Sequence, residues 1–374
     1  MGKLEQQISD RLAKRETDQS IRSLSTDKDR VDFYSNDYLG FARCPALRSE
    51  VLEIALAHEE YTLGSTGSRL ISGNDDFTEQ LEKDIAGFHY AESALLFNSG
   101  YDANVGLFSS IVQRGDTIIA DELAHASIID GARLSNAFRY TFKHNDLESL
   151  ENKLKASKGN TVVAVESVYS MDGDQAPLTE IVQLAEKFGA SVIVDEAHAV
   201  GIFGAQGRGL VCQLELENRV FARVVTFGKS LGAHGAAVLG SSKLRSFLIN
   251  YARSFIYSTA APAIAHLTVK RCYERLQNGN FQPAVHEKIR TFKKSVSSFS
   301  HFFLPSDSPI QSLILPGNQR VRQAAEHIRN EGFNVKAILH PTVQQGNERL
   351  RICLHLFNHD TEINTLSQLV QTLL

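Results

Sequence analysis

The stretch TVVAVESVYSMDGDQAPLTEIVQLAEKFGASVIVD, Thr161 to Asp195, predicts a strand, a helix and a second strand in succession. Its two ends are short apolar runs rich in β-branched residues, which favour buried strands. Between them Leu178, Ile181 and Ala185 recur at helical spacing, and Gly189 is typical of a helix end. Alternation of this kind predicts neighbouring parallel strands joined by a helix that covers the sheet.

The same alternation extends outward along the chain in both directions. Further short strands are predicted at residues 94–97, 116–121, 138–142, 223–227 and 236–241. The sequence therefore predicts an α/β fold with a mainly parallel sheet covered on both faces. Ligands bind beyond the carboxyl ends of the strands in such sheets, so functional residues are expected directly after the strands.

Three regions are expected along the 374 residues. Residues 1–45 are predicted to form an N-terminal helix and arm, because Leu4, Ile8 and Leu12 recur at helical spacing. Residues 46–275 are predicted to form the large α/β domain. Residues 276–374 lose the regular alternation and are predicted to form a smaller C-terminal α+β domain.

The composition limits the classes of function. Hydrophobic residues make up 43% of the chain and charged residues 22%, which indicates a globular protein with a substantial core. The formal net charge of −4 gives no electrostatic reason to expect nucleic acid or an anionic membrane as a partner. The four scattered cysteines, the polar N-terminus and the lack of any apolar run of about 18–20 residues predict a cytoplasmic protein that does not enter membranes.

One pair of motifs suggests a nucleic-acid motor. Residues 195–198 read DEAH, as at the end of the magnesium-binding strand of a helicase-type ATPase, and residues 228–230 read GKS, like the end of a phosphate-binding loop. That loop needs the pattern G-x-x-x-x-G-K-[S/T], because its glycines let backbone N–H groups wrap the phosphates. The first glycine of the pattern falls on Arg223, and the DEAH precedes the GKS instead of following it. The motor is therefore disfavoured.

An acid and a lysine beyond neighbouring strands suit pyridoxal phosphate (PLP) instead. That cofactor needs a lysine to hold its aldehyde as a Schiff base, an acid to keep its ring nitrogen protonated, and N–H groups at a helix N-terminus for its phosphate. Asp195 ends the most apolar strand, and Lys229 follows the next strand along the chain. The segment NSGYDAN, residues 98–104, provides a glycine turn that opens a helix. The sequence thus predicts a PLP site.

The chain resembles the α-oxoamine synthases, fold-type I PLP enzymes that condense an amino acid with an acyl thioester and release CO2. The resemblance covers almost the whole chain. It is carried, in order, by FYSNDYLGF (33–41), GSTGSRLISG (64–73), DELAHASIIDG (121–131), SVYSMDGDQAPL (167–178), VDEAHAVGIFGAQGRG (194–209), TFGKSLGAHGAAVLGS (226–241) and RLRICL (349–354). Within the family, the segments KHND (143–146) and ARSFIYST (252–259) are most similar to the biotin-pathway member, which uses L-alanine and a pimeloyl thioester. A sibling synthase that uses glycine or serine with another acyl-CoA is the alternative.

The resemblance implies roles for five residues around the cofactor ring. Lys229 would hold the cofactor and move the α-proton of the substrate, and Asp195 would pair with the ring nitrogen. His198 and Ser170 would hydrogen-bond around the ring hydroxyl, and His125 would stack on the ring. Taken singly, Asp195 also fits a helix N-cap and His125 a structural histidine.

The resemblance also implies the phosphate contacts. Gly100 and Tyr101 would donate backbone N–H groups, and Thr226 would add its hydroxyl. Ser258 and Thr259 would reach the phosphate of a partner subunit, which implies a homodimer with the active site at the subunit interface.

On the substrate side, the resemblance implies that Arg351 binds the amino acid carboxylate, with Asn36 close by. Because Arg349 and Arg351 alternate with apolar residues, their pattern alone also fits the solvent face of an edge strand. No metal site is expected, and His355 and His359 are interpreted as surface residues that lack a third ligand.

Overall fold

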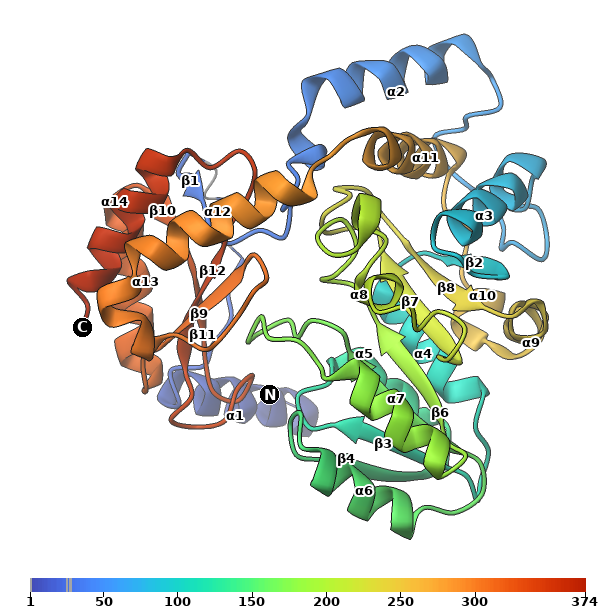
Figure 1. Ribbon diagram of the computed structural model, residues 1–374, viewed down its shortest axis with the longest axis horizontal. Helices are drawn as coiled ribbons and strands as arrows, with labels where there is room; N and C mark the ends of the chain where they lie inside the picture. The colour runs from blue at the N-terminus through green and yellow to red at the C-terminus, as the bar shows by residue number, and fades with distance from the viewer. Residues whose placement is uncertain (1, 25, 27–28) are drawn as a thin grey trace. The chain divides into compact units, whose positions relative to one another are not determined.

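The computed structural model describes residues 2–24, 26 and 29–374 (Figure 1). Contacts divide the chain into two compact units. The large unit consists of Leu39–Ser170 and Gln175–Ala284, and the small unit of Met1–Tyr38, Met171–Asp174 and Val285–Leu374. A division by contacts does not establish which segments fold on their own, so the domain boundaries predicted after residues 45 and 275 stay a prediction.

The large unit is built on a seven-stranded sheet with the strand order β2-β8-β7-β6-β5-β3-β4. The strands are β2 (Ser93–Phe97), β3 (Thr117–Asp121), β4 (Phe138–Phe142), β5 (Thr161–Glu166), β6 (Ser191–Asp195), β7 (Ala222–Thr226) and β8 (Ala236–Gly240). Neighbours from β4 to β7 pair in parallel, whereas β8 is antiparallel to both β7 and β2. The mainly parallel sheet and its strands are confirmed.

Helices cover both faces of this sheet. The helices of the large unit are α2 (Pro45–Ala57), α3 (Asp76–Phe88), α4 (Gly100–Ser110), α5 (Ala126–Leu134), α6 (Leu147–Ala156), α7 (Leu178–Lys187), α8 (Leu210–Gln213), α9 (Ser242–Tyr251), α10 (Arg253–Ile256) and α11 (Ala263–Asn278), with short 3-10 turns at Phe41–Arg43 and Ala205–Gly207. Among them, α2 packs against α11. Leu107 and Phe108 of α4 pack with Ile128 of α5 and with alternate strand residues such as Ile193 in one buried cluster. On α7, the predicted apolar stripe is buried, and the helix lies beside β6 (Figure 1). This packing fixes the loops that follow the strands.

The small unit contains a three-stranded antiparallel sheet, β11 (Lys336–Ile338), β12 (Arg349–Cys353) and β9 (Ile310–Ile314), with β12 in the middle. Its helices are α1 (Lys3–Thr17), most of α12 (Gln282–Ser295), α13 (Asn318–Asn330) and α14 (Asp360–Gln371), with a 3-10 segment at Ser297–Phe302. The α+β composition expected for the C-terminal region is therefore present.

The N-terminal arm joins the C-terminal part of the chain in this unit, a pairing that the sequence did not predict. Strand β1 (Val31–Asp32) pairs in parallel with β10 (Phe333–Asn334). After it, the backbone of Phe33 accepts a hydrogen bond from Cys353 N over 2.8 Å. The arm consequently runs alongside β12. None of the helices in the described residues combines the length and apolar character that a membrane span requires.

Candidate active site

The predicted site residues of the large unit lie at one edge of its sheet. Because β2, β3, β5, β6 and β7 all run in the same direction, their carboxyl ends meet at this edge. Residues 98–100, 121–125, 166–170, 195–198 and 226–229 follow these five ends in turn. The candidate residues therefore lie where the sequence predicted, and their functions stay a prediction.

Lys229 and His198 meet at this edge, from the loops after β7 and β6. Lys229 Nζ lies 2.7 Å from His198 Nε2, and the imidazole is buried. Asp195, also buried, ends β6 and accepts a hydrogen bond at Oδ1 from Ala197 N over 2.9 Å, which tightens the turn that leads to His198. An amine, an imidazole and a carboxylate are thus gathered within four residues of two adjacent strand ends.

Two residues that the sequence did not single out connect Asp195 to His125. Asn104 on α4 donates from Nδ2 to Asp195 Oδ2 over 2.7 Å and to Ser127 Oγ over 3.0 Å. Ser127 Oγ in turn lies 2.7 Å from His125 Nδ1. Asn104 and Ser127 are both buried. The segment 98–104 drew attention for its glycine turn, but no local pattern distinguishes an asparagine that orients a distant carboxylate.

His125 caps helix α5, since its Nδ1 accepts a hydrogen bond from Ser127 N over 3.2 Å. Loss of water around the ring lowers the pKa of His125, the carboxylate of Asp195 opposes that shift, and the charge of Lys229 adds to it. The ring is therefore neutral near neutral pH and can stack on a flat aromatic group. His125 also has the structural role that was the alternative interpretation, because the same ring caps a helix.

The N-terminus of α4 forms a cradle with Thr226. Within the described part of the chain, no protein group accepts the N–H groups of Gly100 and Tyr101, whereas Asp102 N donates to the capping Ser99 Oγ over 3.0 Å. Thr226 Oγ1 is buried without a hydrogen-bond partner. A Cβ on Gly100 would lie 2.5 Å from Thr226 Cγ2, so the helix end approaches the threonine closely. Unpaired donors at a helix N-terminus beside an unpaired buried hydroxyl fit a phosphate.

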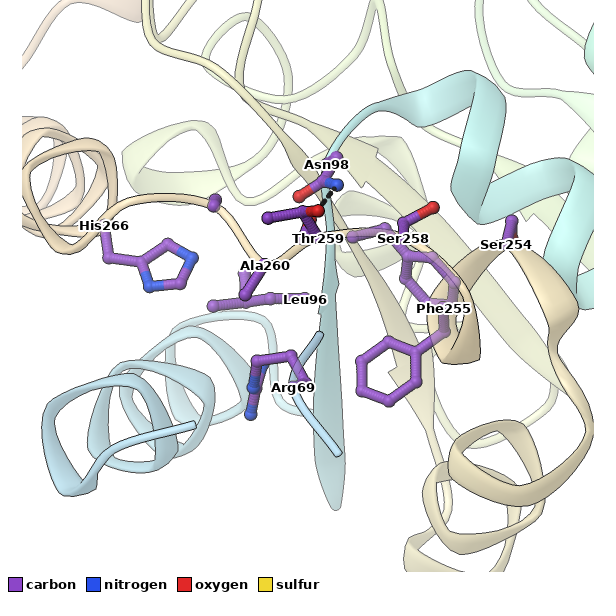
Figure 2. Close-up of a pocket in the computed structure, with 11 residues that line it drawn as sticks. Arg69, Leu96, Asn98, Ser254, Phe255, Ser258, Thr259, Ala260 and His266 are labelled. Carbon is purple, nitrogen blue, oxygen red and sulfur yellow. Dashed lines mark hydrogen bonds between the residues drawn. The ribbon is translucent and has the colours of Figure 1, made fainter. Parts of the chain in front are cut away.

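The remaining predicted residues of the large unit occupy two places. Ser170 follows β5 and is half-buried. Ser258 and Thr259 line a small pocket together with Arg69, and Asn98 Nδ2 donates to Thr259 O over 2.7 Å (Figure 2). Thr259 is exposed.

The acid after Asp195 has a structural function. Glu196 is fully buried, with one carboxylate oxygen 3.8 Å from the guanidinium of Arg223, and it accepts a hydrogen bond from Val211 N over 2.9 Å. Arg223 lies inside β7 and donates to the carbonyl of His89 over 2.5 Å. Glu196 of the DEAH and Arg223, at the first glycine position of a phosphate-binding loop, are therefore parts of a buried structural network, which agrees with the rejection of the motor.

In the small unit, the two predicted substrate residues are joined. Arg351 Nη2 donates to Asn36 Oδ1 over 3.0 Å, and Nη1 lies 3.0 Å from Cys353 Sγ. Tyr38 also donates its hydroxyl to Asn36 Oδ1, over 3.1 Å. The guanidinium of Arg351 is thereby held in one orientation by the N-terminal arm and by its own strand.

Two interpretations of this region are wrong. Arg349 and Arg351 are each only 5% exposed, because β12 is the central strand of its sheet and Arg349 pairs with Asp172 over 2.5 Å. His355 is 1% exposed and not a surface residue, since its Nδ1 lies 3.0 Å from Asn358 Oδ1. Over the residues that the structure describes, no group of three or more His, Cys, Asp or Glu side chains could hold a metal ion.

Comparison with known proteins places the chain in a family. The model of the family "Aminotransferase class I and II" matches residues 28–364. The chain belongs to this family. A protein of Emericella nidulans named 8-amino-7-oxononanoate synthase is 42% identical over 368 residues, covering 91% of this chain and 89% of the relative.

Solved structures agree with the family over nearly the full length. A structure of serine palmitoyltransferase (SPT) with a PLP internal aldimine has a TM-score of 0.92 at 26% identity. The match covers 100% of this chain and 98% of that one. The 8-amino-7-oxononanoate synthase of Francisella tularensis has a TM-score of 0.80 at 27% identity, with coverage of 92% and 98%. The resemblance to the α-oxoamine synthases and the fold-type I architecture are confirmed.

Proposed function

We propose that this enzyme uses PLP to join L-alanine to a pimeloyl thioester, releasing CO2 and the free thiol and forming 8-amino-7-oxononanoate for biotin biosynthesis. The thioester carrier is coenzyme A or an acyl carrier protein. The observation that carries the proposal is the meeting of Lys229, His198 and Asp195 at adjacent strand ends. These groups occur in a chain that is 42% identical to a protein named for that reaction.

The residues at the sheet edge fit PLP. Lys229 would be the amine for its aldehyde, Asp195 the carboxylate for its ring nitrogen, and Gly100, Tyr101 and Thr226 the donors for its phosphate. When bound, PLP withdraws electrons from the α-carbon of the amino acid and so stabilises the carbanion formed there.

The side chains around Lys229 control one proton. The free Lys229 amine would take the α-proton of the substrate and later return it. His198 Nε2, 2.7 Å from Nζ, orients this amine. Ser170 and His198 would hydrogen-bond around the ring hydroxyl of PLP. His125 would stack on the face of the PLP ring, where a neutral imidazole adds no charge.

Arg351 holds the carboxylate of L-alanine, with Asn36 beside it. A guanidinium fixed by Asn36 and Cys353 is preorganised for bidentate recognition of a planar carboxylate. That grip orients the α-hydrogen of the substrate for transfer.

The assignment of Lys229 is tested by the variant Lys229→Ala, with Lys243→Ala on the exposed end of α9 as the matched control. Lys229→Ala is expected to lose the borohydride-sensitive yellow chromophore and turnover, while the control keeps both. A yellow Lys229→Ala protein with normal turnover would defeat the proposal.

A sibling reaction is the second candidate, because the SPT structure has the higher TM-score of the two solved structures. In that reaction glycine or serine replaces alanine and another acyl-CoA replaces the pimeloyl thioester. Release of CO2 is measured with alanine, glycine and serine, each against pimeloyl-CoA, a pimeloyl carrier protein and palmitoyl-CoA. Alanine with a pimeloyl donor is expected to be fastest, and preference for serine with palmitoyl-CoA would establish the sibling function instead.

A homodimer with the active site at the interface is also proposed. Ser258 and Thr259 would then act on the phosphate of the partner subunit. Support comes from the large apolar side chains exposed nearby in sequence, Leu63, Ile71 and Tyr257, and from the 2.9 Å hydrogen bond between Ala260 N and Gly67 O that joins their two segments. Sedimentation equilibrium is expected to give twice the chain mass, and a monomer at all concentrations would contradict the proposal. A cytoplasmic location stays a prediction of the sequence.

A further inference from the structure

Glu166 is a buried carboxyl group that the mechanism above does not use. It ends β5, is 3% exposed, and is the register partner of Asp195 at the end of β6. Neighbouring strands lie roughly 4.8 Å apart, so two carboxyl side chains stand side by side at the sheet edge. Two like charges in such a place are strongly unfavourable unless one of them is neutralised.

The partners of Glu166 do not neutralise it. The backbone N–H groups of His125 and Ser170 donate to its carboxyl group, but Oε1 is buried and has no hydrogen-bond partner. Among the ion pairs of the described residues, none includes Glu166, and Lys229 is directed to His198. Asp195, by contrast, receives donors at both of its oxygens. Of the two carboxyl groups, Asp195 is the better site for the negative charge.

We propose that Glu166 is a neutral, protonated acid that positions the backbones of His125 and Ser170 and leaves the negative charge at this place to Asp195. Its value for catalysis rests on the proposed function, which assigns both anchored residues to the cofactor ring. Glu166 is a positioning residue in this proposal and touches neither substrate nor cofactor.

The electrostatic surroundings support this assignment. Burial raises the pKa of Glu166 to about 8, and the charge of Asp195 adds to the shift. Lys229 and the N–H groups of His125 and Ser170 oppose it. Asp195 faces Glu166 from β6, Lys229 from the loop after β7 and His125 from the start of α5. The effect of burial on the pKa of Glu166 exceeds the effects that lower it.

The protonation state can be observed directly in the full-length protein, with and without added PLP. The C=O stretching band of a protonated carboxyl group is followed by infrared spectroscopy at neutral pH in the wild type, in Glu166→Gln and in the control Glu148→Gln, whose glutamate is exposed on α6. We expect the wild type and the control to have the band and Glu166→Gln to lose intensity in it. An unchanged band in Glu166→Gln would overturn the proposal.

A second measurement uses the pH dependence of unfolding. The folded-state pKa of about 8 lies above the ordinary value of 4.5, so the native state holds a proton that the unfolded chain releases between these values. This contribution to stability is complete below pH 4.5 and is lost as the pH rises toward 8. The free energy of unfolding of the wild type minus that of Glu166→Gln should fall across this window with the slope expected for one bound proton. Parallel profiles of the two proteins would overturn the proposal.

Failure of this proposal is distinguishable from failure of the proposed function. Both measurements can be made without PLP, so a chromophore lost or kept in Lys229→Ala does not affect them. Glu166→Ala, which removes the acceptor, should also lose the protection of the His125 and Ser170 amides against hydrogen exchange, whereas Glu166→Gln should retain it. Equal protection in the two variants would show that Glu166 anchors neither backbone.

Discussion

Asn104 on α4 and Asp195 at the end of β6 are joined by a hydrogen bond of 2.7 Å from Nδ2 to Oδ2. The other carboxylate oxygen of Asp195 accepts from Ala197 N. The carboxylate is consequently held from both sides, which fixes the direction in which it presents its charge. Preorganised charge of this kind does not need to reorient during a reaction.

Replacing Asn104 with alanine should weaken PLP binding and turnover together. A hydrogen bond to a charged group contributes about 1.5–3 kcal/mol, which corresponds to roughly 10–150-fold in affinity. The dissociation constant is measured by titrating PLP into the cofactor-free protein. Asn250→Ala, at an exposed position of α9, is the control. If both variants bind PLP equally well, Asn104 does not orient Asp195.

Gly100 and Thr226 should show coupled effects on the phosphate cradle. The new Cβ of Gly100→Ala would collide with Thr226 Cγ2 at 2.5 Å. This variant is expected to bind PLP at least tenfold less tightly, because a displacement that costs about 1.4 kcal/mol lowers the affinity tenfold. Thr226→Ser removes that methyl group and keeps the hydroxyl. The next contact of the new Cβ, with Thr226 Cβ, is an ordinary 3.7 Å.

The double variant Gly100→Ala/Thr226→Ser should therefore bind PLP better than Gly100→Ala alone. A double-mutant cycle of the four dissociation constants measures this coupling. Additive losses in the cycle would mean that the helix end and the threonine do not form one cradle.

Arg351 should act on substrate binding and leave the cofactor in place. Arg351→Lys keeps the charge but loses the planar fork, so the KM for L-alanine should rise by roughly tenfold or more while the chromophore is unchanged. Asn36→Ala, which removes only one acceptor from the guanidinium, should have a smaller effect in the same direction. The exposed Arg320→Lys serves as the control. A bleached cofactor in Arg351→Lys would contradict this role.

Sequence periodicity predicted the strands of the large unit and the edge at which the site lies, because burial on a parallel sheet leaves a local pattern. It did not predict Asn104, whose partner Asp195 is 91 positions away. It also could not decide where Arg351 lies. Alternation with apolar residues is the same for a solvent-facing strand and for a central strand whose arginines find buried partners, and only the pairing of β12 with both β9 and β11 decides between them.

The N-terminal arm illustrates the same limit. The role of Asn36 was implied by the family resemblance. Its arm lies alongside β12 because β1 pairs with β10, and these two strands come from opposite parts of the chain. Such a contact depends on backbone groups that every residue possesses, so side-chain patterns carry little information about it.

His266 should make the protein sensitive to acid. It is 6% exposed in the pocket that it shares with Arg69 (Figure 2), and its Nδ1 lies 2.9 Å from Thr78 Oγ1. Burial lowers the pKa of His266 to about 4, and the charge of Arg69 adds to the shift. Because the unfolded chain binds this proton at about pH 6.5, the contribution of the neutral ring is complete above that pH and is lost as the pH falls toward 4.

His266→Asn keeps a hydrogen-bonding group near Thr78 and removes the titration, so its stability should fall less steeply than that of the wild type between pH 6.5 and 4. The difference should reach roughly 3 kcal/mol once both pKa values are passed. Urea unfolding at a series of pH values measures it, with His301→Asn at an exposed position as the control. If the His266→Asn and wild-type profiles have the same slope, the ring binds its proton at the same pH in the native and unfolded states, and the acid sensitivity of the protein must come from other groups.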